Sequence, residues 1–108
     1  MIQIVYHRKF HRLTMEGHAG SAEHGKDLVC ASASILAYTL AKNVLKLAAG
    51  GQIRMSPVVK MEEGRTEICV TPRSGFQSVV TLIFDSLCIG FALLANDYPE
   101  NISYEIRE

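Results

Sequence analysis

The predicted fold depends first on the stretch DLVCASASILAYTLAKNVLKLAAGG, residues 27–51. Asp27 is a favoured N-cap residue, and Gly50-Gly51 ends the pattern. Between these ends, apolar residues recur at helical spacing: Leu36, Leu40, Val44 and Leu47. We therefore expect one long helix that begins directly after Asp27 and has Cys30 in its first turn.

The segments before this helix predict a β-hairpin followed by a loop. Apolar residues alternate with others over residues 2–6, and a second extended segment covers residues 10–15. The turn between them, residues 7–11, lacks the usual glycine or asparagine, and its short basic cluster indicates an exposed turn. Residues 17–26 are rich in glycine and small polar residues, which predicts a loop without regular structure.

The segments after this helix predict an extended segment, a strand, a second helix and a last strand. Pro57 interrupts the extended segment, which makes it an edge strand or two short pieces. The sequence Glu62-Glu63-Gly64 forms the turn that follows. The four predicted ranges are residues 53–61, 66–71, 76–96 and 102–106.

The element order β-β-α-β-β-α-β predicts an α+β fold. We expect a single domain over residues 1–108, built as a two-layer sandwich with both helices packed on one face of a single sheet. The second helix carries more apolar residues than one sheet face covers. A homodimer is therefore expected to bury the remainder.

Composition limits the class of protein and its partners. The chain has 108 residues, of which 48% are hydrophobic and 20% charged, which is typical of a globular protein. Lys plus Arg and Asp plus Glu are 11 each, so no net charge attracts the whole molecule to nucleic acid or to an acidic membrane. We expect no direct nucleic-acid binding.

Cysteine usage and the N-terminus favour a cytoplasmic protein. Three cysteines without CxxC spacing argue against a disulfide framework and for a reducing compartment. The first residues lack the basic and apolar regions of a signal peptide. The most apolar stretch, residues 79–95, is interrupted by polar residues, so we interpret it as a buried helix and expect no membrane association.

The chemistry that the sequence offers centres on Cys30 and His18. In the first helical turn, unpaired backbone N–H groups and the helix dipole favour a thiolate at Cys30. His18 lies in the preceding glycine-rich loop and is a candidate proton acceptor for this thiol. Helix N-terminal N–H groups near Cys30 are candidate donors to the oxyanion that forms on a peptide carbonyl. These residues predict a Cys-His dyad.

Each of these residues also has a structural interpretation. A lone helical cysteine is usually a small core residue, and a lone loop histidine is usually a surface residue. We expect Asp27 to act first as the N-cap of the helix and only second as a partner that orients His18. Ser34 lies one turn after Cys30, where its hydroxyl either bonds to the dyad or back-bonds to its own helix.

Other ligand sets and cysteines are weaker candidates. His18, Glu23, His24 and Cys30 do not have the intervals of a compact zinc site, so no metal and no cofactor is expected. Cys69 and Cys88 lack nearby activating groups in the sequence, and we expect both in the core.

The elements GHAG, residues 17–20, and GKDLVCA, residues 25–31, followed by Ser34, resemble the ribosomal-processing cysteine protease Prp family, also called YsxB-like. The interval of twelve positions from His18 to Cys30 is similar to that of the family. The resemblance implies a cytoplasmic, homodimeric endopeptidase that removes the N-terminal extension of bacterial large-subunit ribosomal protein twenty-seven, whose precursor is its substrate.

The resemblance also assigns roles to residues. It implies Cys30 as nucleophile, His18 as base and Asp27 as the assisting acidic residue. It implies substrate contacts for Gly17, Ala19, Gly20 and Ser34, with the glycine-rich loop closing over the substrate. The sequence departs from the family at Ser21 and His24, where aromatic residues are frequent, so substrate contacts are expected to differ there.

A second functional class remains open at this point. The basic turn that contains Arg8 and Lys9 would also suit a non-catalytic ribosome-associated module that binds a protein or RNA partner. Such a module would bind its partner without Cys30, in a salt-dependent way. The protease hypothesis requires the thiol.

Overall fold

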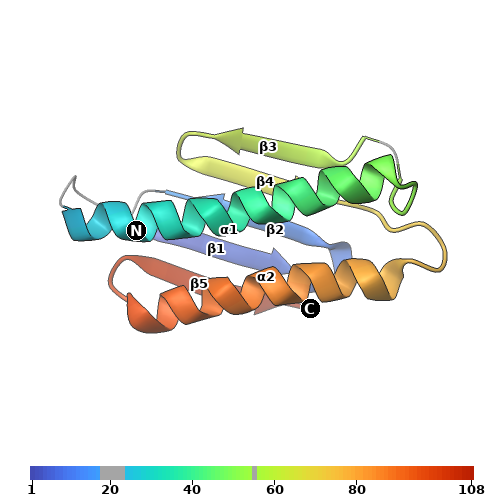
Figure 1. The fold of residues 1–108 in the computed structure, drawn as a ribbon. Helices are drawn as coiled ribbons and strands as arrows, with labels where there is room; N and C mark the ends of the chain where they lie inside the picture. The colour runs from blue at the N-terminus through green and yellow to red at the C-terminus, as the bar shows by residue number, and fades with distance from the viewer. Residues whose placement is uncertain (18–23, 55) are drawn as a thin grey trace.

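The structure of this protein is a computed structural model that describes residues 1–17, 24–54 and 56–108, with residues 24–27 described by their backbone alone. Its elements follow the predicted order β-β-α-β-β-α-β (Figure 1). They are β1 Ile2–His7, β2 Arg12–Glu16, α1 His24–Ala49, β3 Val58–Glu62, β4 Arg65–Cys69, α2 Gln77–Asp97 and β5 Ile102–Arg107, with a 3-10 helix, Arg8–Phe10, between β1 and β2.

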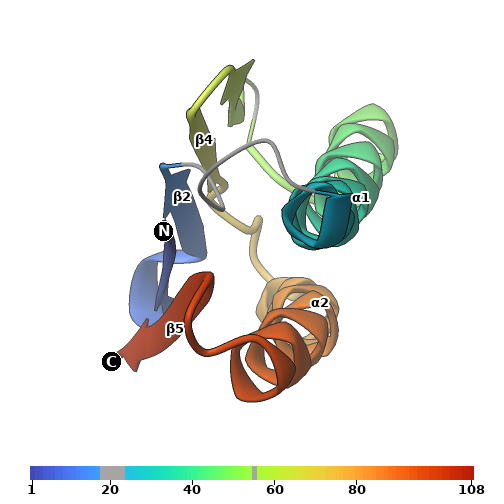
Figure 2. The ribbon, with the colours of Figure 1, turned by 90° about the vertical axis from the view of Figure 1, so that its left-hand side faces the viewer.

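The five strands form one mixed sheet in the order β3-β4-β2-β1-β5. β1 and β5 are parallel, and the other neighbouring strands are antiparallel. Viewed along the helices, α1 and α2 lie side by side on the same face of the sheet (Figure 2). The predicted two-layer α+β sandwich is therefore confirmed.

The core lies between the sheet and the two helices because the strands alternate buried and exposed side chains. From β1 the buried residues are Ile2, Ile4 and Tyr6, and from α2 they include Phe84 and Phe91. The opposite sheet face is polar and carries cross-strand ion pairs. Arg12 Nε, for example, lies 2.8 Å from Glu67 Oε2.

The β1–β2 connection shows how a turn forms without glycine. The 3-10 helix Arg8–Phe10 is followed by His11, whose φ of 48° lies in the left-handed region. Histidine adopts this region more readily than most residues. The His11 ring is buried, with Nε2 2.7 Å from Thr81 Oγ1, so α2 holds this conformation in place.

Several element boundaries differ from the predicted ones. α1 begins at His24, so residues 24–26 of the predicted loop are helical, and Asp27 is inside the helix instead of being its N-cap. Residues 18–23 of that loop lie outside the described residues. In the segment that Pro57 interrupts, Ile53 forms an isolated bridge to Pro72, and β3 is the edge strand that follows. The two predicted alternatives for that segment, an edge strand or two short pieces, are therefore each confirmed in part.

Both helices are long and apolar enough to cross a membrane by length and composition, over Leu28–Ala49 and Gln77–Asp97. In this structure each buries one face against the sheet. The prediction that residues 79–95 form a buried helix is only half correct. On the outer face of α2, Leu82, Ile89 and Leu93 are exposed by 64%, 63% and 60%.

Candidate active site

Helix α1 presents Cys30 on a face that borders the β3–β4 hairpin. Cys30, Ser34 and Tyr38 follow one another at intervals of four residues, which places them along one side of the helix. Val29, Ala33 and Ala37 are buried in the core, which fixes the rotation of α1 about its axis. Cys30 is consequently half-buried at the margin of the core.

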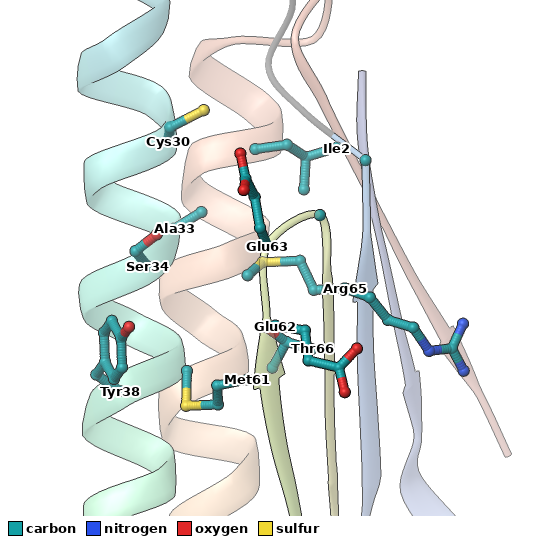
Figure 3. A pocket seen from close by; sticks show the side chains of 13 residues that line it. Ile2, Cys30, Ala33, Ser34, Tyr38, Met61, Glu62, Glu63, Arg65 and Thr66 are labelled. Carbon is teal, nitrogen blue, oxygen red and sulfur yellow. The ribbon is translucent and has the colours of Figure 1, made fainter.

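A groove of about 400 Å³ separates this side of α1 from the hairpin. Ile2 and Met15 contribute from the central strands. Cys30 lies on the α1 side (Figure 3). The hairpin supplies the opposite wall, with Met61, Glu62, Glu63, Gly64, Arg65 and Thr66. The thiol of Cys30 therefore opens into a cavity large enough for several side chains of a peptide.

Gly17 joins the end of β2 to this groove. Its N–H donates a hydrogen bond to the carbonyl oxygen of Gly64 at 2.9 Å, which connects β2 to the hairpin turn. Its φ is +100°, and a Cβ on it would lie 2.2 Å from the carbonyl oxygen of Met1. Only glycine fits here without a shift of the backbone. The chain that continues to His18 leaves the sheet at this fixed point.

The structure places three of the predicted site residues on one groove: Gly17, Cys30 and Ser34. His18, Ala19 and Gly20 lie outside the described residues, so the dyad geometry stays a prediction. Asp27 lies in α1, one helical turn before Cys30, and its role also stays a prediction.

The predicted setting of Cys30 in the first helical turn is wrong. Because α1 begins at His24, Cys30 is its seventh residue, and helical N–H groups bond to the carbonyl four residues earlier. The unpaired N–H groups of a helix lie in its first turn, which comes before Cys30 here. The N–H of Cys30 is therefore not a free oxyanion donor, and the helix dipole, which acts within the first turn, contributes less than expected.

The remaining cysteines are poor nucleophiles. Cys88 is buried, and burial raises the pKa of its thiol to about 11. Cys69 is half-buried on the polar sheet face, where burial raises the pKa of its thiol and Sγ lies 3.7 Å from the carbonyl oxygen of Phe10. Cys88 is a core residue as predicted, whereas Cys69 lies on the face away from the helices.

Ser34 does not back-bond to its helix. Its neighbour Ser32 donates a hydrogen bond to the carbonyl of Leu28 at 2.7 Å, but within the described residues Ser34 has no such bond. Its hydroxyl is available to the groove. The zinc alternative involves His18, Glu23 and His24, whose side chains lie outside the described part, so it is untested.

The wall formed by the hairpin was missed by sequence reasoning. Glu63 lines the groove but is far from His18 and Cys30 in sequence. Tyr38, on the helix side, also lines the groove but belongs to no sequence motif. Helical spacing alone would have found Tyr38, since it continues the Cys30–Ser34 face. No local signal marks Glu63, because its position depends on how the sheet places the hairpin beside α1.

The model of the family described as cysteine protease Prp matches residues 1–103. This chain belongs to the cysteine protease Prp family. Among solved structures, the chain is similar to SMU.848 from Streptococcus mutans, with 28% identity over 98% of this chain and 93% of that one and a TM-score of 0.69. Among curated proteins, no sequence matches it.

Two similar structures are of the essential ribosomal processing protease Prp from S. aureus. One holds a covalently linked product peptide and has 22% identity and a TM-score of 0.72; the other holds a substrate peptide and has 21% identity and a TM-score of 0.71. Each alignment covers 98% of this chain and 97% of the other. At this identity they establish the Prp fold, and the family match establishes a cysteine protease.

Proposed function

We propose that this Prp-family protease removes the N-terminal extension of large-subunit ribosomal protein twenty-seven, with Cys30 as nucleophile and His18 as base. The observation that carries the proposal is the thiol of Cys30 at the edge of a groove of about 400 Å³. The S. aureus relative, described as a ribosomal processing protease and solved with a substrate peptide, supports the choice of substrate.

The reaction proceeds through an acyl-enzyme. His18 takes the proton of the Cys30 thiol, and Sγ attacks the scissile carbonyl carbon to form a tetrahedral oxyanion. Collapse breaks the C–N bond, and His18 returns the proton to the departing amine. Water then gives its proton to His18 and attacks the thioester, which releases the new carboxylate and restores the thiol.

Other residues support this reaction in the proposal. Asp27, which does not serve as an N-cap, orients His18 from one helical turn before Cys30. Gly17, Ala19, Gly20 and Ser34 contact the substrate, and the hydroxyl of Ser34, without an intrahelical bond, donates to the peptide. Differences from the family at Ser21 and His24 change contacts at the loop.

Replacement of the nucleophile tests the proposal. Cys30→Ala is expected to lower the rate of cleavage of a peptide that spans the extension junction by at least about a thousandfold, because the acyl-enzyme cannot form. Cys69→Ala, on the other sheet face, is the matched control and is expected to cleave at the wild-type rate. Cleavage by Cys30→Ala at the wild-type rate would contradict the mechanism.

Thiol alkylation provides an independent test. Since burial raises the pKa of Cys69 and Cys88, both thiols stay protonated near neutral pH. Iodoacetamide is expected to alkylate Cys30 first, as measured by peptide mass mapping. Alkylation of Cys69 before Cys30 would count against an activated nucleophile.

The non-catalytic alternative loses part of its basis. Arg8, one of the two cations of the basic turn, donates two hydrogen bonds to Asp85, from Nε at 3.1 Å and from Nη2 at 2.9 Å. Its charge is largely compensated within the molecule. The turn is therefore a weaker site for an acidic partner than the sequence indicated.

We further propose a cytoplasmic homodimer that covers the outer faces of the helices. Exposed apolar residues on both helices support it, namely Leu28, Ile35, Leu45, Leu82, Ile89 and Leu93. Ile89→Glu is expected to shift the mass in sedimentation equilibrium from about twice 11.9 kDa to the monomer value. Gln3→Glu, which adds the same charge on the other sheet face, is the control. A monomeric wild-type protein would refute the dimer.

A further inference from the structure

Strand β3 forms one edge of the sheet. It pairs with β4 on one side, and no described element lies beyond it on the other (Figure 1). An edge strand offers unpaired N–H and C=O groups to another chain. The register with β4 is continuous over residues 58–62, without a bulge that would twist this edge away. β3 is therefore a regular template for one more strand.

The hydrogen bonds at the two ends of β4 show which groups of β3 point outward. The carbonyl oxygen of Gly64 accepts a hydrogen bond from Gly17 at 2.9 Å, and the N–H of Val70 donates to the carbonyl oxygen of His11 at 3.1 Å. Alternate residues of a strand bond to opposite neighbours. The even-numbered residues of β4 therefore bond to β2, and the odd-numbered ones bond to β3.

Val59 and Met61 are the residues of β3 whose N–H and C=O groups point outward. Their register partners are Ile68 and Thr66, which are even-numbered and bond to β2. Residues of an antiparallel pair that do not bond to each other direct these groups away from each other. Within the described residues, no other backbone group bonds to Val59 or Met61 outside the sheet. Each of them leaves one donor and one acceptor open.

This open edge borders the groove that contains Cys30. Met61 lines the groove, and its side chain lies on the helix side of the sheet because its partner Thr66 is buried. In Figure 3 Met61 lies at the level of Tyr38, and the hairpin turn at Glu63 lies nearer to Cys30. β3 therefore runs toward Cys30.

The groove has the length of a short extended peptide. From Cys30 to Tyr38 there are eight helical residues, or roughly 12 Å. This length corresponds to about three to four residues of a strand. A peptide that starts at the thiol therefore reaches the outward groups of Met61 within about four residues, and those of Val59 two residues farther along β3.

We propose that β3 binds the substrate by strand addition, in which the residues before the scissile bond pair through their backbone with Met61 and Val59. This inference rests on the proposed function for the identity of the reaction. After the amine departs, the part before the scissile bond stays attached to Cys30. It runs toward Cys30, as β3 does, so the pairing is parallel. The backbone bonds supply affinity and hold the thioester in place while water attacks.

Amide hydrogen exchange, followed by NMR, measures this pairing directly. In the free protein the outward N–H groups of Val59 and Met61 are expected to exchange fast, whereas that of Lys60, which bonds to Glu67, is expected to exchange slowly. Saturation of Cys30→Ala with the extension-junction peptide is expected to slow both outward groups about tenfold or more. Fast exchange in the complex would overturn the inference. Slow exchange in the free protein would also overturn it, because another partner would already cover the edge.

A tethered peptide makes the test independent of the proposed substrate. A peptide of about five residues that alternates threonine and valine carries a C-terminal cysteamine, which forms a disulfide with Cys30 by exchange with an activated disulfide. Cys69→Ala is the background, because the remaining thiol, Cys88, is buried. Slowed exchange at Val59 and Met61 is again expected, and its absence overturns the inference. Slowed exchange in this conjugate, with no cleavage of the extension-junction peptide by the wild type, identifies failure of the proposed function alone.

Val59→Pro tests the pairing in the active enzyme. Proline removes the outward N–H at this position and no bond to β4, and edge strands tolerate proline at such positions. KM for the extension-junction peptide is expected to rise about tenfold, with kcat unchanged. Val59→Thr keeps the N–H and a similar shape, and this matched control is expected to keep the wild-type KM. Equal KM values for the two folded variants would overturn the inference.

N-methylation of the substrate distinguishes a paired strand from other extended binding. In a strand, only every second N–H points toward the neighbouring strand. Methyl groups placed one at a time before the scissile bond are expected to raise KM about tenfold at alternate residues and less than about twofold at the residues between them. Equal effects at neighbouring positions would contradict strand addition.

Discussion

Single residues with left-handed backbone conformations fix the ends of the first two strands. His11, with a φ of 48°, ends the β1–β2 connection and buries its ring against α2. Gly17, with a φ of +100°, ends β2 next to the carbonyl oxygen of Met1. Gly17 lies on the groove, whereas His11 lies at the other end of β2. At Gly17 both the backbone conformation and the contact with Met1 oppose a side chain.

Gly17→Ala is expected to lower the free energy of unfolding by about 2 kcal/mol or more, because strained φ and contact with Met1 both oppose the Cβ. Urea denaturation measures the loss. Gly51→Ala is the control, since Gly51 also has a positive φ, +72°, but nothing lies within 4 Å of its Cβ position.

The Gly51→Ala control measures the loss of stability caused by the left-handed φ alone, which is expected to be about 1 kcal/mol. If the two variants lose the same stability, the approach of Met1 to Gly17 contributes nothing. Such a result would mean that the N-terminus moves freely away from Gly17.

At the scale of elements, α1 and α2 contact each other closely where Gly90 meets Leu36. A Cβ on Gly90 would lie 2.8 Å from Leu36 Cδ2 and 2.9 Å from Cδ1. Glycine inside a helix costs about 1 kcal/mol relative to alanine. This cost is tolerated because glycine lets the two helices approach each other closely. The close approach in turn helps to set the orientation of the helix face that carries Cys30.

Gly90→Ala is expected to destabilise the wild type by about 1 kcal/mol, because overpacking exceeds the gain in helix propensity. In a Leu36→Ala background the same change is expected to stabilise by about 1 kcal/mol, since space is available. Denaturant unfolding of the four proteins measures the coupling of about 2 kcal/mol. Equal effects in both backgrounds would exclude the proposed contact.

At the scale of the whole molecule, a polar network connects β1, the 3-10 helix and α2. The Tyr6 hydroxyl donates to Asp85 Oδ1 at 2.9 Å, and Arg8 binds both oxygens of Asp85. The hydrogen bond from Arg8 holds the pKa of Asp85 below its ordinary value. Burial lowers the pKa of His11, which lies beside this network.

These shifts predict two pH ranges of instability. With the pKa of His11 lowered, the unfolded chain binds more protons below about pH 6.5, so the free energy of unfolding falls as the pH drops from there. The contribution of Asp85 is present above about pH 4 and is lost at lower pH. Urea denaturation from pH 8 to pH 3 measures both.

His11→Asn is expected to remove the decline that begins near pH 6.5 and to keep the one below pH 4, because asparagine does not titrate and tolerates the left-handed φ. A wild-type slope between pH 6.5 and 5 in this variant would show that another group titrates on unfolding.

The sequence by itself determined the element order and the candidate nucleophile. Hydrophobic periodicity and glycine or proline breaks are local signals, so residues 2–6 and 102–106 were assigned correctly as strands. The GHAG and GKDLVCA elements are local signals as well, and they identify Cys30 as the candidate nucleophile. The predicted helix start was wrong because Asp27 is a good cap in isolation, whereas the chain continues the helix back to His24.

Only the tertiary structure decided the second wall of the site. Glu63 is more than thirty positions from Cys30 in sequence, and its place in the groove depends on the pairing of β3 with β4 and on the rotation of α1 over the sheet. The neighbouring Glu62 has the same chemistry and also borders the groove, but its carboxylate points away from α1 (Figure 3). Sheet register and helix packing are long-range properties, so which of two adjacent glutamates faces the nucleophile cannot be deduced from local sequence.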